Sequence, residues 1–188
     1  MLTETQRRQL IDIARESLHH GLMHGSPLQV DTNSLDATLS APGASFVTLH
    51  RHGQLRGCIG SLEPYQALAA DVAHNAFSAA FRDPRFPPLD QSEVDDLALE
   101  VSVLGTPEEI TFSSEQDLLN QLRPGTDGLI LEENGRRGTF LPSVWESLPQ
   151  PEEFLRQLKL KAGLPADYWS DTIRVWRYST ESFGDKTL

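Results

Sequence analysis

The sequence predicts an α/β protein in which helices flank a mixed sheet. Segments whose apolar residues recur at helical spacing follow one another along the chain with segments that alternate apolar and polar residues, as strands do. The dipeptide Asn134-Gly135, between two β-prone runs, gives a strong hairpin signal. Helices interleaved with hairpins favour a mixed sheet over a parallel doubly wound one.

The first predicted helix covers residues 3–20. Thr3 and Gln6 form a capping-box pattern at its start, and Gly21 and Gly25 are expected to end it. Its apolar face is formed by Leu10, Ile13, Ala14 and Leu18. The following residues 26–45 are polar and include proline, so we expect an irregular connection there.

A hairpin is predicted next, with strands at residues 46–51 and 54–59 and a two-residue turn at His52-Gly53. In this register Arg51 faces Gln54, Leu49 faces Arg56, and Val47 faces Cys58. Arg56 and Cys58 then share one face of the sheet. A three-residue turn would change this pairing.

The clearest predicted helix covers residues 64–81, with Pro64 in its first turn and prolines after its end. A strand is predicted at residues 97–104, with leucine and valine on one side and Glu100 and Ser102 on the other. The remaining predicted elements are helices at residues 113–122, 142–148 and 151–162, and strands at residues 128–133, 136–141 and 172–178.

Length and composition limit the class of protein. The 188 residues are enough to bury a core as one domain or as two closely packed subdomains. Sixteen basic and 27 acidic residues give a net charge of −11, which argues against nucleic acid as a partner. Residues 3–8 lack a signal-peptide core, and no apolar run reaches the roughly 18–20 residues of a membrane span. We therefore expect a cytoplasmic protein that does not enter a membrane.

The strongest candidate site is the segment from Leu55 to Gly60, with the sequence Leu-Arg-Gly-Cys-Ile-Gly. Arg56 on the same strand face would stabilise a thiolate at Cys58, the only cysteine in the chain. Gly57 and Gly60 would let a ligand or another backbone come close. The alternative is that Cys58 is a small buried hydrophobic residue and that the glycines form a bulge.

Two further features carry charge. Arg82, Asp83 and Arg85 lie in a proline-stiffened corner that could grip a carboxylate or phosphate group. They could equally form an internal ion pair or cap the preceding helix. Glu100 is a candidate general base or arginine partner if it faces a cleft, and otherwise it faces solvent beside Ser102.

No metal site and no cofactor are predicted. His19, His20 and His24 follow a helix end without an acidic residue at a recognised ligand spacing. One cysteine cannot build a cysteine-based zinc site or an iron–sulfur cluster. The chain contains no P-loop, dinucleotide fingerprint, Gly-x-Ser-x-Gly or His-Glu-x-x-His motif. His50 and His52 are expected at a turn, as exposed polar residues.

Taken in order, several motifs resemble the AMMECR domain family, which includes the A component of the AmmeMemoRadiSam set. The core of the resemblance is Arg56-Gly57-Cys58-Ile59-Gly60, which is highly specific. The resemblance continues along nearly the whole chain, at residues 55–62, 75–76, 79–89, 100–104, 127–131, 138–145 and 158–164.

This resemblance implies one AMMECR-type domain over residues 1–188, with an α/β fold of two subdomains and the Cys58 segment near the cleft between them. It implies a setting beside a Memo-type protein and a radical S-adenosylmethionine enzyme. It raises site candidates without giving them roles: Arg56, Cys58, Arg82, Asp83, Arg85 and Glu100.

Two hypotheses of function follow. The first is an enzyme or enzyme subunit of a modification system that uses Cys58 as nucleophile or acceptor. The second is a non-catalytic module that holds a small anionic ligand, a nucleotide or a partner protein in the cleft. The absence of standard catalytic motifs favours the second, and the glycine-flanked thiol favours the first.

Overall fold

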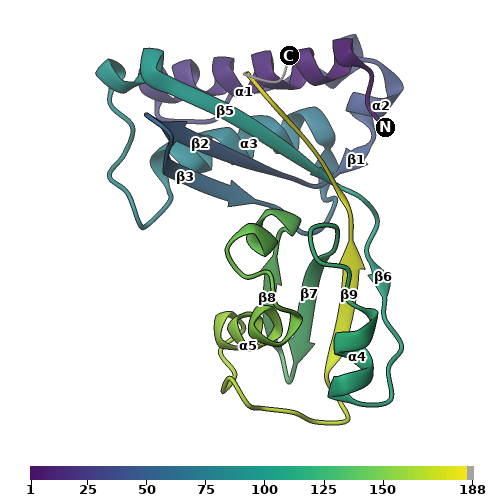
Figure 1. The fold of residues 1–188 in the computed structure, drawn as a ribbon. Coiled ribbons are helices and arrows are strands. Elements are labelled where there is room, and N and C mark those ends of the chain that lie inside the picture. The colour runs from purple at the N-terminus through teal and green to yellow at the C-terminus, as the bar shows by residue number, and fades with distance from the viewer. Residues whose placement is uncertain (186–188) are drawn as a thin grey trace. The chain divides into compact units, whose positions relative to one another are not determined.

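The computed structural model describes residues 1–185 (Figure 1). The chain divides into two compact units, the first formed by Met1–Leu104 with residues 181–185, and the second by Gly105–Thr180. Each unit combines helices with a sheet, so the predicted α/β class is confirmed. Within residues 1–185, no helix combines the length and apolar character needed to cross a membrane.

The helical elements are the α-helices α1 (Glu4–His24), α2 (Ala37–Ser40), α3 (Leu68–Phe81), α4 (Glu115–Gln121) and α5 (Pro151–Lys161), and the 3-10 helices η1 (Thr32–Ser34), η2 (Gln91–Asp96) and η3 (Pro142–Glu146). The strands are β1 (Pro42–Gly43), β2 (Ser45–Arg51), β3 (Gln54–Gly60), β4 (Gln66–Ala67), β5 (Leu97–Leu104), β6 (Glu108–Glu109), β7 (Gly128–Glu133), β8 (Arg136–Phe140), β9 (Arg174–Tyr178) and β10 (Thr180–Gly184).

The first unit is built on a four-stranded sheet with the order β10-β5-β2-β3. Strand β2 is antiparallel to both β3 and β5. Helices α3 and α1 cover one face of this sheet (Figure 1). Val47, Leu49, Leu99 and Val101 point from the strands into the core beneath these helices. The other face of the sheet, which we call the open face, carries the alternate side chains of β2, β3 and β5.

Helix α1 begins with the predicted capping box. Thr3 Oγ1 accepts the Gln6 N–H at 3.3 Å, and Gln6 Oε1 accepts the Thr3 N–H at 2.8 Å. The prediction that Gly21 ends the helix is wrong, because α1 continues to His24 and Gly25 closes it with φ 67°. A Cβ at Gly21 would lie 2.4 Å from the Phe81 ring, so this glycine lets α1 approach α3 closely.

The β2–β3 hairpin has the predicted two-residue turn, and Arg51 pairs with Gln54. A bulge after Leu49 then shifts the register by one residue. Leu49 therefore pairs with Gly57, and the predicted pairs of Leu49 with Arg56 and of Val47 with Cys58 are wrong. Since the extra residue at a bulge leaves the alternation of the strand, Arg56 does not share a face with Cys58.

Helix α3 begins at Leu68, four residues later than predicted. The preceding Gln66 and Ala67 form β4, which pairs with β1 and keeps Pro64 outside the helix. The helix ends at Phe81, as predicted, and Arg82 follows as its C-cap. The proline-containing segment after it turns at residues 83–86 and contacts β3 through Asp83 and Pro87.

The second unit contains the sheet β6-β9-β7-β8. The β7–β8 hairpin turns at Asn134 and Gly135, whose φ angles of 49° and 75° confirm the predicted turn. Helix α5 packs on this sheet, and its Phe154 stacks on Trp145 with ring centroids 3.7 Å apart. Strand β10, which the sequence analysis did not predict, takes the chain back to the first unit, beside β5.

Candidate functional site

Three polar side chains form a row across the open face of the first unit. Thr48 in β2 pairs with Cys58 in β3 on one side and with Glu100 in β5 on the other. Directly paired residues point to the same face of an antiparallel sheet. Because Val47 and Leu49 point into the core, this row lies on the opposite, open face. We call it the Cys58–Thr48–Glu100 row.

The thiol of Cys58 is in direct contact with Thr48. Thr48 Oγ1 donates to Cys58 Sγ at 3.3 Å, and Cys58 is partly exposed. The Cys58 main-chain N–H points away from β2, toward Asp83. The two residues therefore form a non-hydrogen-bonded pair, the kind in which facing side chains approach most closely. A hydroxyl that donates to sulfur favours the thiolate over the thiol.

Asp83 and Arg85 hydrogen-bond to the backbone of Cys58 on the edge of β3 that faces away from β2. Asp83 Oδ2 accepts the Cys58 N–H at 3.0 Å, and Arg85 Nη2 donates to the Cys58 carbonyl at 3.4 Å. Arg85 also binds Asp83 through Nε at 3.0 Å and Nη2 at 2.7 Å. Side chains thus take the place of a neighbouring strand at this residue, and they fix the backbone that carries the thiol.

Asp83 and Arg85 form a close ion pair, with Arg85 Nη2 at 2.7 Å from Asp83 Oδ2. The Arg85 guanidinium holds the pKa of the buried Asp83 carboxyl far below its usual range, and the N–H groups of Cys58 and Arg85 lower it further. The same contact raises the pKa of Arg85, to which the charge on Cys58 adds a smaller effect. Arg85 therefore supplies the positive charge near the thiol that the sequence analysis had assigned to Arg56.

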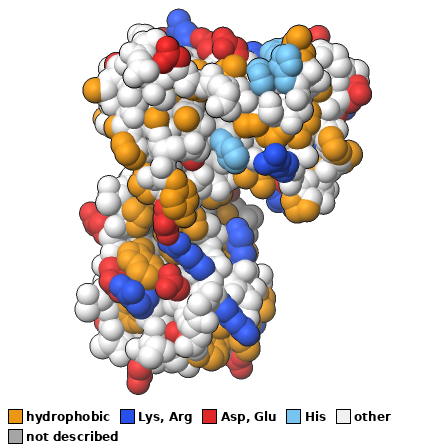
Figure 2. Space-filling view, turned by 180° about the vertical axis from the view of Figure 1, so that it is seen from behind, with side chains coloured by type: hydrophobic (Ala, Val, Ile, Leu, Met, Phe, Trp, Pro, Cys, Tyr) orange, Lys and Arg blue, Asp and Glu red, His pale blue; other side chains and the backbone are white. Residues whose placement is uncertain are grey.

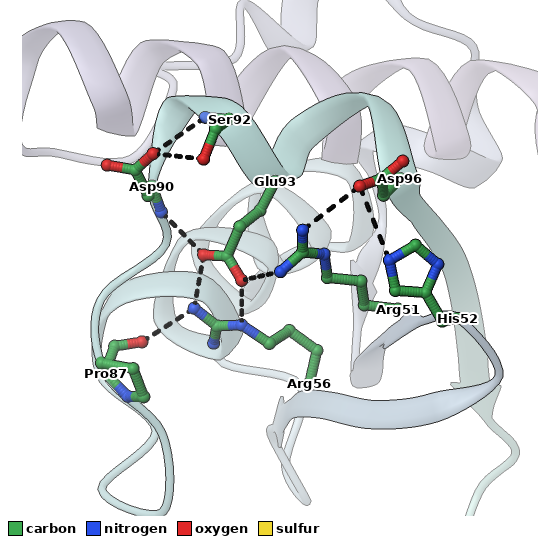
Figure 3. A network of polar contacts seen from close by, with 8 residues as sticks. All are labelled: Arg51, His52, Arg56, Pro87, Asp90, Ser92, Glu93 and Asp96. Carbon is green, nitrogen blue, oxygen red and sulfur yellow. Dashed lines mark hydrogen bonds and ion pairs between the residues drawn. The ribbon is translucent and has the colours of Figure 1, made fainter.

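Arg56 has other partners (Figure 3). Its guanidinium donates to Glu93 through Nε and Nη2, both at 2.9 Å, and to the Pro87 carbonyl at 3.0 Å. Arg51 also binds Glu93, at 3.2 Å. These contacts, with that of Arg56 first, lower the pKa of Glu93 to about 2. Arg56 thereby ties the bulge in β3 to η2 and to the corner after α3.

The other predicted site residues have packing partners. A Cβ at Gly57 would lie 2.1 Å from the Ala79 carbonyl oxygen in α3, and one at Gly60 would lie 2.2 Å from the Phe46 ring. Another backbone and an aromatic ring thus approach these glycines closely. The Arg82 guanidinium lies over the Phe77 ring of its own helix, 5.0 Å from the centroid.

A buried carboxylate anchors the strands that carry the row. Asp71 of α3 accepts hydrogen bonds from Ser45 N–H at 2.8 Å, Ser45 Oγ at 2.7 Å and Ser61 Oγ at 2.7 Å. Asn75 donates to the same carboxylate at 3.0 Å. Ser45 begins β2 and Ser61 follows β3, so Asp71 fixes both ends of the hairpin. No motif in the sequence pointed to this cluster.

A cavity of about 560 Å³ opens on the first unit beside Glu100. His50, two residues from Thr48 on the same face of β2, also lines it. The sequence analysis assigned His50 to an exposed turn, although its alternation with Leu49 and Val47 could have placed it on the open face. The lining residues are His50, His52, Gly53, Asp95, Asp96, Leu97, Ala98, Leu99, Glu100, Ser182, Phe183 and Gly184.

Charged side chains of both signs are intermixed on one face of the molecule (Figure 2). On the face shown in Figure 2, Lys and Arg lie among Asp, Glu and hydrophobic side chains. Several exposed charges are paired, as in the contact of Arg174 Nε with Glu109 Oε1 at 2.8 Å. No group of three or more His, Cys, Asp or Glu side chains that could hold a metal ion occurs within residues 1–185.

Comparison with known proteins places these features in a family. The family model described as AMMECR1 matches residues 11–183, which include most of both units. A protein of Methanothermobacter thermautotrophicus is 39% identical over 188 residues, with 97% of this chain and 95% of the relative covered. A protein of Thermotoga maritima is 37% identical over 162 residues, with 85% of this chain and 88% of the relative covered.

A solved structure has the same fold. The crystal structure of the uncharacterized protein PH0010 from Pyrococcus horikoshii matches with a TM-score of 0.87 and 34% sequence identity. The match covers 95% of this chain and 90% of that one. The fold described above is therefore shared with an experimentally determined relative.

Proposed function

Because the chain belongs to the AMMECR1 family, we propose that it is a component of an AmmeMemoRadiSam-type modification system and acts through the Cys58–Thr48–Glu100 row. The observation that carries this proposal is the contact of Thr48 Oγ1 with the partly exposed Cys58 thiol. A thiol on an open sheet face, held by a hydroxyl and flanked by a guanidinium, is arranged to react.

In this proposal Cys58 is the nucleophile or group acceptor. The thiol proton passes to a base, and we assign this role to His50, which shares the face of β2 with Thr48. The thiolate then forms a bond to an electrophilic carbon of the substrate, and the leaving group departs with the electron pair of the broken bond. Arg85, close to the Cys58 carbonyl, stabilises the thiolate before attack.

The proposed partners are a Memo-type protein and a radical S-adenosylmethionine enzyme, in the cytoplasm. The family resemblance supports this setting. The chain's one cysteine fits this setting, because this chain alone cannot supply the several cysteine ligands of an iron–sulfur cluster.

The first experiment is the pH dependence of iodoacetamide labelling on the native protein. Cys58 is the only cysteine, so the signal comes from one thiol. Rapid labelling with an apparent pKa well below the usual value of about 8.5 is expected for a stabilised, accessible thiolate. Labelling only after denaturation would contradict the proposal. In a reconstituted three-component system, Cys58→Ala should abolish activity, and unchanged activity would rule out a role for the thiol.

A second candidate function is a non-catalytic module that binds a small anionic ligand, a nucleotide or a partner protein. Arg85 favours it, because 55% of its side chain is exposed although Asp83 beside it is buried. In that case Arg85→Ala weakens binding and Cys58→Ser leaves it unchanged. Loss of activity in Cys58→Ser would eliminate the module, because a purely binding protein does not need the thiol.

A further inference from the structure

We infer that the cavity beside Glu100 binds the protonated amino group of a small aliphatic substrate. The cavity lies within the first unit, between the start of β5, the β2–β3 turn and β10. Its volume of about 560 Å³ falls in the range of small-molecule sites, roughly 300–1,000 Å³. This inference rests on the proposed function, because Glu100 belongs both to the cavity and to the row that contains Cys58.

The charge of the lining selects a cation. Asp95, Asp96 and Glu100 are the carboxylates of the wall, and no described Lys or Arg side chain lines the cavity. Arg51 pairs with Asp96 at 3.2 Å and so offsets one of these charges. Within residues 1–185, the side-chain carboxylates of Asp95 and Glu100 have no hydrogen-bond or ion-pair partner. Two uncompensated carboxylates beside one hollow attract a positive group.

Burial makes Glu100 the stronger of the two anchors. Asp95 is exposed, whereas Glu100 is partly buried on the open face, next to Ala98 and opposite Thr48. A partly buried carboxylate interacts more strongly with an incoming cation, because less water screens the pair. His50 also projects from this face and lines the same cavity. The wall thus offers one partly buried carboxylate and one exposed carboxylate.

The spacing of the lining groups favours an organic cation over a metal ion. A metal ion requires several ligands that converge on one point. The His and acidic side chains of this cavity do not form such a group within the described part of the chain. Ligands spread along a wall instead match an extended molecule with a charged end.

This geometry also orients the substrate. Glu100, Thr48 and Cys58 stand on three adjacent strands, and neighbouring strands are about 4.8 Å apart. An amino group held at Glu100 leaves the rest of a short aliphatic molecule free to lie across β2 toward the thiol. The cavity would then set specificity, and the row would carry out the chemistry.

The test is calorimetric titration of the protein with 1,5-diaminopentane. The controls are 1,5-pentanediol and glutarate, which are neutral and anionic molecules of the same length. We expect saturable binding of the diamine alone. Glu100→Gln should weaken it about tenfold or more and Asp95→Asn about twofold to threefold, whereas Asp12→Asn, at an exposed acidic residue of α1, should not. Thermal unfolding of each variant checks that it is folded.

The outcomes separate this inference from the proposed function. Absence of diamine binding, equal binding of glutarate, or wild-type affinity in both Glu100→Gln and Asp95→Asn would overturn the cavity assignment. Cys58→Ser should bind the diamine as the wild type does. Diamine binding that persists while Cys58 proves unreactive would uphold the cavity and reject only the thiol chemistry.

Discussion

Thr48 and Cys58 face each other on adjacent strands, and the Thr48 hydroxyl donates to the thiol at 3.3 Å. This contact exists because the bulge after Leu49 moves Cys58 one position along the hairpin. Without the bulge, Val47 would face the cysteine, and the thiol would point into the core. One extra residue in β3 therefore determines whether the side chain of the only cysteine points into the core or lies on the open face.

Removal of the Thr48 hydroxyl should make Cys58 less reactive. In Thr48→Val the sulfur loses a donor that stabilises its charged form, so we expect iodoacetamide labelling at pH 7 to slow severalfold. Thr48→Ser keeps the hydroxyl and should label at close to the wild-type rate. Equal rates for all three proteins would mean that the hydroxyl has no influence on the thiol.

Glu93 should contribute stability that is lost in acid. Its pKa in the folded protein, about 2, lies below the ordinary value of 4.5. The contribution is therefore complete above pH 4.5 and decreases as the pH falls through about 2. At pH 7 we expect Glu93→Gln to lower the free energy of unfolding by about 3 kcal/mol, since Arg56 also loses its buried charged partner.

Urea unfolding at pH 7, 4 and 3 measures this effect. The difference between wild type and Glu93→Gln should shrink as the pH falls, while Glu16→Gln, at an exposed residue of α1, should match the wild type throughout. A difference that stays constant with pH would show that the loss comes from packing and not from the charge of Glu93.

Gly57 should tolerate no side chain. Its Cβ would lie 2.1 Å from the Ala79 carbonyl oxygen, which belongs to a helix backbone and cannot move aside easily. We expect Gly57→Ala to cost about 3 kcal/mol or more. Gly25→Ala is the comparison, because Gly25 has a φ of 67° but open space around it, and should cost only about 1–2 kcal/mol. Chemical denaturation that gives equal losses would contradict the close approach of α3.

Asp71 should be essential for the start of β2. Asp71→Asn replaces one acceptor oxygen by a donor that faces the donors of either Ser45 or Ser61, which bond to different oxygens of Asp71, so we expect a loss of about 2–3 kcal/mol. Ser61→Ala removes two hydrogen bonds, one to Asp71 and one from Asn75, and should cost about 1–2 kcal/mol. Hydrogen exchange at the Ser45 amide reports on the site directly, and unchanged protection in Asp71→Asn would refute this role.

Local signals in the sequence predicted much of the fold. The Thr3–Gln6 capping box, the Asn134-Gly135 turn and the alternation of residues 97–104 each lie within one element, and each is present in the structure. Long-range contacts decided the remaining features. Gly21 stays inside α1 because it packs on α3, and Pro64 stays outside α3 because β4 pairs with β1.

In the candidate site, too, single residues could be predicted from the sequence, but their arrangement depends on long-range contacts. The sequence predicted Cys58 and Glu100 separately, but their common face depends on the register of three strands. It assigned the arginine near the thiol to Arg56, on the assumption of an unbroken strand, whereas Arg85 reaches Cys58 from the corner after α3. Spacing along one strand cannot reveal a bulge that is stabilised by Glu93, a residue far away in sequence.

The return of β10 to the first unit has a consequence for synthesis on the ribosome. Strand β5 ends at Leu104, but its neighbour β10 begins only at Thr180, after the whole second unit has been translated. The nascent first unit must therefore wait with one sheet edge unpaired while the second unit emerges and folds. Chaperones that protect exposed strand edges would act on this protein during that interval, and emergence of β10 would end it.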